Sequence, residues 1–291
     1  MGLIFRDNYD ILAVSGKPDG TIVLNLLRRK PQKGNGCMKL EKIGVQLYTI
    51  RGFLDTEEQV KVSFDKLKKM GYDEVQTAGC AIPYKDFGRL AKEAGIDIVG
   101  THDNFGVMVE TPELAMENHD YLDTKIMGIG GFFGKTKEEY VDFIAKANKV
   151  AAAIKDRGFK FTYHNHSHEF RKVDGKLIMD MLIEGMDPAN TGFVLDTYWV
   201  QHGGGDVRYW IEKLAGRVDI LHLKDMLKTA EGAPQAITEV GNGNLYWEGI
   251  LETAFKTGVK HFVVEQDNAP DTGDPFACLK KSSDYLHANF F

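Results

Sequence analysis

The chain is poor in cysteine. Its 291 residues include three cysteines, Cys37, Cys80 and Cys278, which lie far apart and outside any Cys-x-x-Cys pair. Secreted domains held by disulfides and zinc sites built from thiolates both need more cysteines at short spacings. The sequence therefore excludes a disulfide framework and a thiolate metal cage, and we expect a reducing, cytoplasmic compartment.

Long hydrophobic runs and an excess of positive charge are also missing. No apolar segment approaches the roughly 20 residues that span a bilayer, and acidic residues occupy the N-terminal stretch where a signal peptide has its apolar core. The 42 Asp and Glu outnumber the 36 Lys and Arg, so the net charge is −6. Proteins that bind nucleic acid need a basic surface for the phosphates. We therefore expect a soluble protein with no membrane or nucleic-acid partner.

What the chain does contain is a regular alternation of short β-branched or aromatic runs with longer amphipathic stretches. This alternation is typical of β-α-β units and a parallel sheet. Eight runs qualify as strands: residues 43–48, 74–77, 97–102, 125–129, 160–165, 192–196, 219–224 and 261–265. Eight β-α units fill about 250 residues in a closed (β/α)8 barrel. The sequence predicts an α/β fold, a single-domain TIM barrel, over residues 38–291.

Two of the stretches between these strands show helical spacing. Their spacing predicts helices over residues 57–70 and 138–155. The buried face should include Val60, Phe64 and Leu67 in the first helix, and Val141, Ile144, Ala145 and Ala152 in the second. Glycines follow several of the helical stretches, where a left-handed helix end is expected: Gly71, Gly95, Gly158 and Gly258.

Residues 1–37 precede the first strand and do not fit the repeating pattern. Residues 10–27 are compatible with a hairpin around Lys17-Pro18-Asp19-Gly20, and residues 28–36 form a basic, glycine-containing linker. Two interpretations stay open for this N-terminal extension. It is either an extra hairpin that covers the barrel bottom or a partner, or a disordered leader with Met38 as the natural start.

Four consecutive predicted strands end in side chains that bind metals. In strand order, five to eight, they are His164, Asp196, His222 and Glu265. Neighbouring members are about one β-α unit apart, so all four should lie on the carboxyl rim of the barrel, where such barrels carry their function. Imidazole and carboxylate ligands without thiolate suit Mn, Zn, Fe or Co, or a tolerant Mg site. The sequence predicts one divalent metal ion, with Mn as the first choice.

These strand ends belong to an ordered series of motifs: residues 44–49 (GVQLYT), 163–170 (YHNHSHEF), 195–199 (LDTYW), 222–225 (HLKD), 239–243 (EVGNG) and 264–267 (VEQD). From about Lys42 to the last predicted helix, the series resembles the sugar phosphate isomerase/epimerase family, within the xylose-isomerase-like TIM-barrel superfamily. The resemblance implies a metal on the four residues above, bound to adjacent oxygens of a keto-sugar or polyol. Keto-sugar epimerases of this superfamily usually carry a glutamate where this chain has His164, so their two-glutamate proton transfer is not expected unchanged.

Isomerising or epimerising a sugar requires that a proton leave a carbon beside a carbonyl, which needs a Lewis acid and a base. The candidate catalytic groups are Glu265, as ligand and base at once, together with Lys224 and Glu169. The candidate substrate-binding groups are Tyr48, at the end of the first strand, His102 and His166. Asp225 and Asp267 are expected to hold a ligand imidazole or nearby lysines.

The leading hypothesis is a metal-dependent isomerase or epimerase of a monosaccharide or keto-sugar, which acts through a stabilised enediolate. The alternative is a lyase or dehydratase on a keto-sugar, keto-inositol or 3-keto-glycoside, because the Tyr-His-x-His strand end resembles the inosose dehydratase branch. An endonuclease of this barrel type would need further histidines, and Trp199 stands where one is expected. A non-catalytic sugar-binding barrel would not need all four ligands. A homo-oligomer is compatible with the sequence.

Overall fold

The computed structural model describes residues 9–16, 22–28 and 39–291, and the chain divides into two compact units between Lys39 and Leu40. In the N-terminal unit, strands β1 (Tyr9–Gly16) and β2 (Ile22–Arg28) pair antiparallel. They match the range 10–27 in which the sequence indicates a hairpin, with one further residue at each outer end. The expected turn at residues 17–20 and residues 29–36 of the expected linker lie outside the described residues.

The larger unit is a barrel of eight parallel strands, in the spatial order β5-β4-β3-β14-β11-β10-β7-β6. The strands are β3 (Gly44–Gln46), β4 (Glu74–Thr77), β5 (Asp97–Thr101), β6 (Ile126–Ile129), β7 (Lys160–His164), β10 (Thr191–Asp196), β11 (Val218–Leu223) and β14 (His261–Val264). Between β5 and β6 the ring closes through the Asp103 N–H, which donates to Gly128 O at 2.8 Å. The predicted TIM barrel is confirmed, with every predicted strand found.

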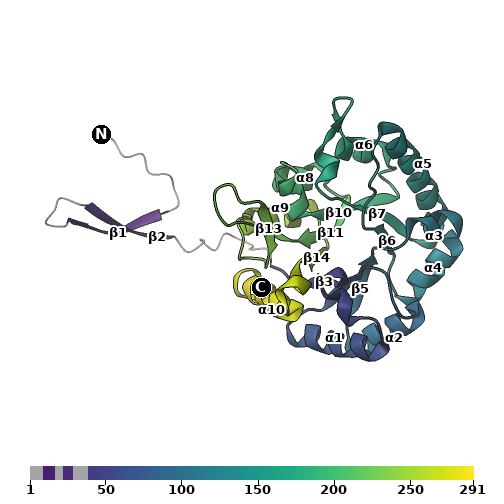
Figure 1. The fold of residues 1–291 in the computed structure, drawn as a ribbon, viewed down its shortest axis with the longest axis horizontal. Coiled ribbons are helices and arrows are strands. Elements are labelled where there is room, and N and C mark those ends of the chain that lie inside the picture. Colours follow the sequence, from purple (N-terminus) through teal and green to yellow (C-terminus); the bar gives the residue numbers. More distant parts are fainter. Residues whose placement is uncertain (1–8, 17–21, 29–38) are drawn as a thin grey trace. The chain divides into compact units, whose positions relative to one another are not determined.

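Helices surround the strands on the outside of the barrel (Figure 1). They are α1 (Glu57–Lys69), α2 (Tyr84–Ala94), α3 (Phe105–Glu110), α4 (Pro112–Tyr121), α5 (Lys137–Ile154), α6 (Ile178–Gly185), α7 (Thr197–His202), α8 (Val207–Lys213), α9 (Trp247–Thr257) and α10 (Pro275–Phe290). In the described parts of the chain, no helix has the length and apolar character needed to cross a membrane.

Short elements decorate the loops between strands and helices. Four are 3-10 helices: η1 (Leu47–Phe53), η2 (Lys155–Arg157), η3 (His168–Phe170) and η4 (Ala269–Thr272). Two hairpins pair β8 (Lys172–Val173) with β9 (Lys176–Leu177), and β12 (Asp225–Lys228) with β13 (Gln235–Thr238). Most of these elements follow the carboxyl end of a strand, so they build the rim around the predicted site.

The two helices predicted from spacing are both present, but only the first buries the predicted face. In α1, Thr56 and Gln59 form a capping box, and Val60, Phe64 and Leu67 are buried as predicted. In α5, the prediction of Val141 as a buried residue is wrong, since its side chain is 55% exposed. Ala145 and Ala152 are exposed as well, and Ile144 is half-buried. The buried face is made by Tyr140, Phe143, Ala147, Val150, Ala151 and Ile154.

Side chains fill the barrel interior, so the strands enclose a packed core rather than a pore. Val99, Val194, Ile220 and Val263 form a buried cluster, with Ile126 packed against it. These residues lie on strands from all around the ring. The four predicted metal ligands lie above this layer, at the carboxyl ends of the strands, and the apolar floor separates that end of the barrel from the other.

Candidate metal centre and substrate cavity

The four predicted metal ligands meet at one point. His164 ends β7, Asp196 ends β10, His222 lies in β11, and Glu265 follows β14 directly. One nitrogen or oxygen atom of each lies within 4.8 Å of the corresponding atoms of the other three. Parallel pairing explains this convergence, because Asp196 and His222 are register partners on adjacent strands. All four side chains are buried.

The arrangement of the ring nitrogens fits a bound cation. His222 Nδ1 lies 2.9 Å from Glu265 Oε2, but the two are not aligned as a hydrogen bond, and both atoms are buried without a hydrogen-bond partner. The other nitrogen of each ligand ring is held from behind: His222 Nε2 contacts Gln76 Oε1, and His164 Nδ1 lies 3.3 Å from Gly130 O. Metal-binding histidines are oriented in this way. A divalent cation between these groups would satisfy His222 Nδ1 and would share Glu265 Oε2 with the Lys224 ammonium, which lies 2.8 Å from that oxygen.

Lys224 brings a second positive charge to the centre. Its ammonium lies 3.0 Å from Asp196 Oδ2, 2.8 Å from Glu265 Oε2 and 3.0 Å from Asp267 Oδ1, and its side chain has no exposed surface. Burial opposes charge on Asp196 and Glu265, but the Lys224 ammonium together with His164 and His222 outweighs burial and holds the pKa of both carboxyls below the usual range. Both carboxyls are therefore ionised at neutral pH, as metal ligands must be.

The pKa of His222 shows the same competition. Burial lowers this pKa, but Glu265 and Asp196 more than offset burial and raise it above the ordinary histidine value. A proton on Nδ1 and a metal ion would use the same lone pair. Metal binding at this centre therefore involves loss of that proton and becomes weaker as the pH falls.

A cavity of about 380 Å³ opens directly beside the four converging side chains. This volume lies near the lower end of the range for small-molecule sites. Its walls are Tyr48, Ala78, His102, Gly130, Phe133, His164, His166, Lys224, Glu265 and Asp267. Every predicted substrate-binding residue lines it. So do the predicted catalytic residues Glu265 and Lys224.

Two histidines of the cavity, His102 and His166, have lowered pKa values. Burial, reinforced by the neighbouring His164, lowers the pKa of His102 well below the ordinary value. Burial also lowers the pKa of His166 to about 3, with His164 and Lys224 adding to the effect. His102 Nε2 and His166 Nδ1 are buried without a hydrogen-bond partner. Two ring nitrogens are thus available to a polar ligand.

Two predicted residues take positions that differ from the expectation. Tyr48 does not end the first strand, because the chain leaves β3 at Gln46 and turns into η1, where the Tyr48 side chain is 43% exposed at the cavity. Glu169 does not line the cavity. It lies in η3 and accepts hydrogen bonds from Tyr163 OH at 2.7 Å and from the His166 N–H at 2.9 Å. Glu169 therefore supports the loop that carries His166.

Of the two aspartates expected to hold ligands or lysines, Asp267 contacts Lys224 at 3.0 Å. The expectation is wrong for Asp225. Its carboxylate accepts hydrogen bonds from the backbone N–H groups of Gly241 and Gly243 and from Trp247 Nε1. A buried carboxylate surrounded by N–H donors fixes a loop. Asp225 therefore explains the 239–243 motif as a structural feature of the rim.

Two buried glutamines at the centre escaped the sequence analysis. Gln46 on β3 and Gln76 on β4 are register partners with no exposed surface, and Gln46 Nε2 lies 3.1 Å from Gln76 Oε1. Gln46 Nε2 also lies 3.2 Å from His102 Nδ1. A signal was present in the sequence, since a glutamine at the same place in two neighbouring strands is unusual for a barrel interior.

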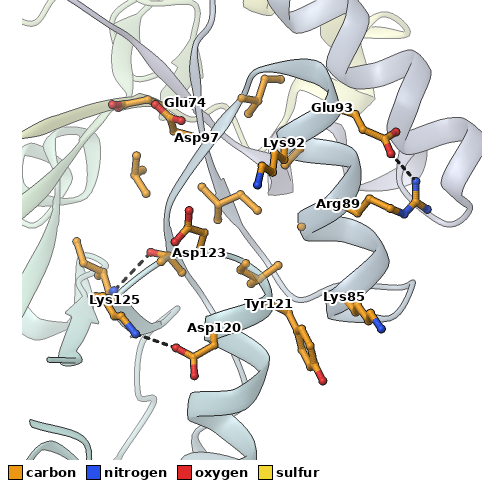
Figure 2. Close-up of a pocket in the computed structure, with 18 of the residues that line it drawn as sticks. Glu74, Lys85, Arg89, Lys92, Glu93, Asp97, Asp120, Tyr121, Asp123 and Lys125 are labelled. Carbon is orange, nitrogen blue, oxygen red and sulfur yellow. Dashed lines mark hydrogen bonds and ion pairs between the residues drawn. The ribbon is translucent and has the colours of Figure 1, made fainter. Parts of the chain in front are cut away.

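A second cavity, of about 1290 Å³, lies at the opposite end of the barrel (Figure 2). Its lining includes residues that begin strands, such as Glu74, Asp97 and His261, together with charged residues of α2. At one edge α2 approaches α4 so closely that a Cβ on Gly88 would lie 2.0 Å from Tyr121 O. The smaller cavity, not this one, contains the convergent buried groups.

Residues 64–286 match the family described as the xylose isomerase-like TIM barrel, so the chain belongs to that family. Among curated proteins, the chain is similar to an inosose dehydratase of Mesomycoplasma hyopneumoniae, with 26% identity over 171 residues. The matched part is 53% of this chain and 55% of the relative. The chain thus spans about half the length of the curated relatives it matches.

Solved structures resemble the chain over most of its length. A sugar phosphate isomerase/epimerase from Parabacteroides distasonis superposes with a TM-score of 0.75 at 22% identity, covering 89% of this chain and 97% of that one. The IolI protein, whose structure was described with a bound zinc atom, gives a TM-score of 0.65 at 15% identity, covering 86% and 99%. At these identities the likeness shows the shared fold. The family resemblance inferred from the motifs is confirmed.

Proposed function

We propose that this member of the xylose isomerase-like family is a metal-dependent carbon-oxygen lyase. Its substrate would be a keto-polyol or keto-sugar that places one ring in the cavity. The supporting observation is that the carboxylates of the cavity all lie on one side of it. Both carboxylates that line the cavity, Glu265 and Asp267, follow β14, whereas His102 and His166 follow β5 and β7, three strands away on either side in the barrel order. Elimination needs a base on only one face of the substrate, but epimerisation needs proton transfer on two.

His164, Asp196, His222 and Glu265 would hold the metal. Bound there, a divalent ion would supply Lewis acidity for the carbonyl oxygen. We favour Mn, with Zn, Co, Fe and Mg as alternatives, because the donor set mixes imidazole with carboxylate. Lys224 contacts both carboxylate ligands and keeps them ionised and in place.

Asp267 is the base that we favour. Its side chain is 26% exposed, lines the cavity and is not one of the four converging side chains, so the carboxylate can face a substrate carbon while the Lys224 ammonium contacts it at 3.0 Å. Asp267 takes the proton from the carbon beside the carbonyl, and the electron pair of that C–H bond moves to the carbonyl oxygen as an enolate. The enolate then re-forms the carbonyl and expels the β-oxygen. That oxygen takes the proton back from Asp267 and leaves as water or an alcohol.

The inosose dehydratase relatives agree with this choice, because a dehydratase releases water. The predicted isomerase or epimerase activity remains the second candidate. His166 favours it, since its unpartnered ring nitrogen lies on the far side of the cavity from Asp267 and is the kind of group that exchanges a proton on the opposite face.

The test uses metal-loaded protein and a panel of keto-inositols and 3-keto-glycosides. Lyase activity yields an enone with ultraviolet absorbance and releases water or an alcohol. Isomerase or epimerase activity yields a product of unchanged mass that carries solvent deuterium. Neither product with any metal would contradict an activity on keto-sugars.

Two variants separate metal binding from proton transfer. Asp267→Asn should keep the metal and lower kcat by about 10²- to 10⁴-fold, the usual effect of removing a positioned base. Asp196→Asn should lose both metal and activity. Asp219→Asn, at the other end of the barrel, is the matched control and should retain both. A fully active Asp267→Asn variant would exclude Asp267 as the base.

A further inference from the structure

We propose that Gln46 and Gln76 act as an amide relay that decides which ring nitrogen carries the proton in two histidines, His102 and His222. The relay makes His102 a hydrogen-bond donor to the substrate and leaves His222 Nδ1 as the ligand atom. The part of the inference that concerns substrate rests on the proposed function. The proton positions themselves are a property of the protein and are tested separately.

The direction of the relay is set by a backbone group. The Tyr48 N–H donates to Gln46 Oε1 at 3.2 Å. A backbone N–H is a donor under all conditions, so it must face the oxygen and not the nitrogen of the Gln46 amide. This contact forms because the chain turns into η1 immediately after Gln46. The Gln46 Nε2 group, with two N–H bonds, is therefore directed at its other neighbours.

The first branch of the relay ends at His102. Gln46 Nε2 lies 3.2 Å from His102 Nδ1. Because Nε2 of the glutamine donates, Nδ1 of the imidazole must accept, and the proton of neutral His102 resides on its own Nε2. His102 Nε2 is buried and has no protein partner, and His102 lines the substrate cavity. The ring therefore presents an N–H to whatever oxygen occupies the cavity.

The second branch ends at the metal centre. Gln46 Nε2 donates to Gln76 Oε1 at 3.1 Å, and the same Gln76 oxygen contacts His222 Nε2. An oxygen only accepts, so His222 Nε2 carries a proton and the lone pair on Nδ1 faces Asp196 and Glu265. Gln76 Nε2 is left without a partner. If the Gln76 amide were reversed, its Nε2 would face the Nε2 of Gln46. Two donors would then meet in a buried site, which costs more than one unpaired group.

Burial of the relay residues lets their hydrogen bonds fix the proton positions of the two histidines. Gln46, Gln76 and His222 have no exposed surface, so water does not compete for their hydrogen bonds. One amide thus couples two tasks on opposite branches. On the first branch, His102 becomes a hydrogen-bond donor to the negative charge that develops on the substrate oxygen. On the second branch, the His222 imidazole is oriented to bind the metal. Gln46 and Gln76 touch neither substrate nor metal in this scheme, so they are positioning residues.

Nitrogen NMR of protein labelled with ¹⁵N in the histidine rings tests the relay directly, because protonated and unprotonated ring nitrogens resonate in separate ranges. Zinc is the probe metal, since it is diamagnetic. The His102 and His222 signals are assigned by their loss in the variants His102→Asn and His222→Asn. In the wild type we expect His102 protonated at Nε2 and bare at Nδ1, and His222 protonated at Nε2. A proton on His102 Nδ1 in the wild type would overturn the inference.

Two substitutions of Gln46 change the relay in different ways. Gln46→Glu keeps the shape but cannot donate, so His102 should gain a proton on Nδ1. Gln46→Met removes the contact without replacing it, and His102 should then show both neutral forms. Gln266→Glu makes the same change at another buried glutamine of the rim and should leave both histidines unaltered. An unchanged His102 signal in both folded Gln46 variants would also overturn the inference.

Activity is measured last, so the two proposals fail independently. If the enzyme is a lyase, Gln46→Met should lose about 10- to 100-fold in kcat/KM, as is common when an outer partner of a site is removed. If no keto-sugar is converted, the NMR result still stands or falls by itself.

Discussion

The two ends of the barrel carry the same types of ionisable side chain in different surroundings. At the carboxyl end, Asp196 and Lys224 have no exposed surface and contact each other at 3.0 Å. At the amino end, Asp219 lies between Lys160 and Lys260, whose side chains are 27% and 67% exposed. Each aspartate is thus paired with lysine, but water reaches only the second group.

Cavity volume alone would place the functional site at the amino end. The amino-end cavity is larger, and Figure 2 shows its charged side chains spread along α2 and the following segments, with pairs such as Arg89–Glu93 on one helix. Such pairs are screened by water and salt. Charge and volume therefore do not identify a site by themselves. Convergence of buried, incompletely paired groups does.

The largest effect should follow from removing the buried cation. Lys224→Met leaves three carboxylates close together without their counter-charge, and breaking a buried ion pair in this way costs about 3–5 kcal/mol. Urea unfolding in the presence of a chelator measures this loss. Added Mn or Zn should restore most of it, because the metal supplies the missing positive charge. Equal stability with and without metal would contradict a cation site.

The pH dependence of activity should follow the ionisation of Asp267 at the carboxyl end of the barrel. Burial raises the pKa of Asp267, Glu265 adds to this effect, and Lys224 opposes it without reversing the shift. A base works only when ionised, so kcat/KM should rise with pH through this raised pKa, above the range of an ordinary aspartate. The same profile for Asp267→Asn should lack that limb. If kcat/KM of Asp267→Asn still rises with pH over this range, the rise reports the ionisation of another group.

A moderate effect is expected from Asp219→Asn at the amino end. The two lysines hold the pKa of Asp219 below its usual value, although burial opposes them. Such a carboxyl stabilises the fold at neutral pH, and its contribution disappears as the pH falls through the lowered pKa. Because both lysines are partly solvated, the loss should be only about 1 kcal/mol or less, and should shrink further in high salt. A loss as large as that of Lys224→Met would remove the contrast between the two ends.

The smallest effect should come from Lys42→Ala. The Lys42–Asp97 pair joins side chains that are 50% and 63% exposed. Substitutions at such positions usually change stability by less than about 0.5 kcal/mol. Thermal unfolding of this variant sets the baseline for the stability changes of Lys224→Met and Asp219→Asn.

Much of the fold was predictable because its signals are local. Eight apolar runs and the glycines behind the helices repeat often enough that single errors do not change the architecture. The left-handed Gly71, Gly95, Gly158 and Gly258 are examples, with φ between 66° and 88°. The face of α5 was not predictable in the same way. Tyr140 and Val141 are neighbours of similar apolar character, and only contact with the barrel decides which of them is buried.

Some features of the site were likewise predictable from local sequence, and others were not. The sequence by itself determined that His164, Asp196, His222 and Glu265 stand at the carboxyl ends of successive strands, because parallel strands in a barrel place those ends on one rim. Only the tertiary structure decided that Glu169 lies behind the cavity and that Asp225 binds a loop. It also decided that Gln46 and Gln76 face two histidines. Those outcomes depend on hydrogen bonds between residues far apart in the chain, whose direction a pattern of residue types does not specify.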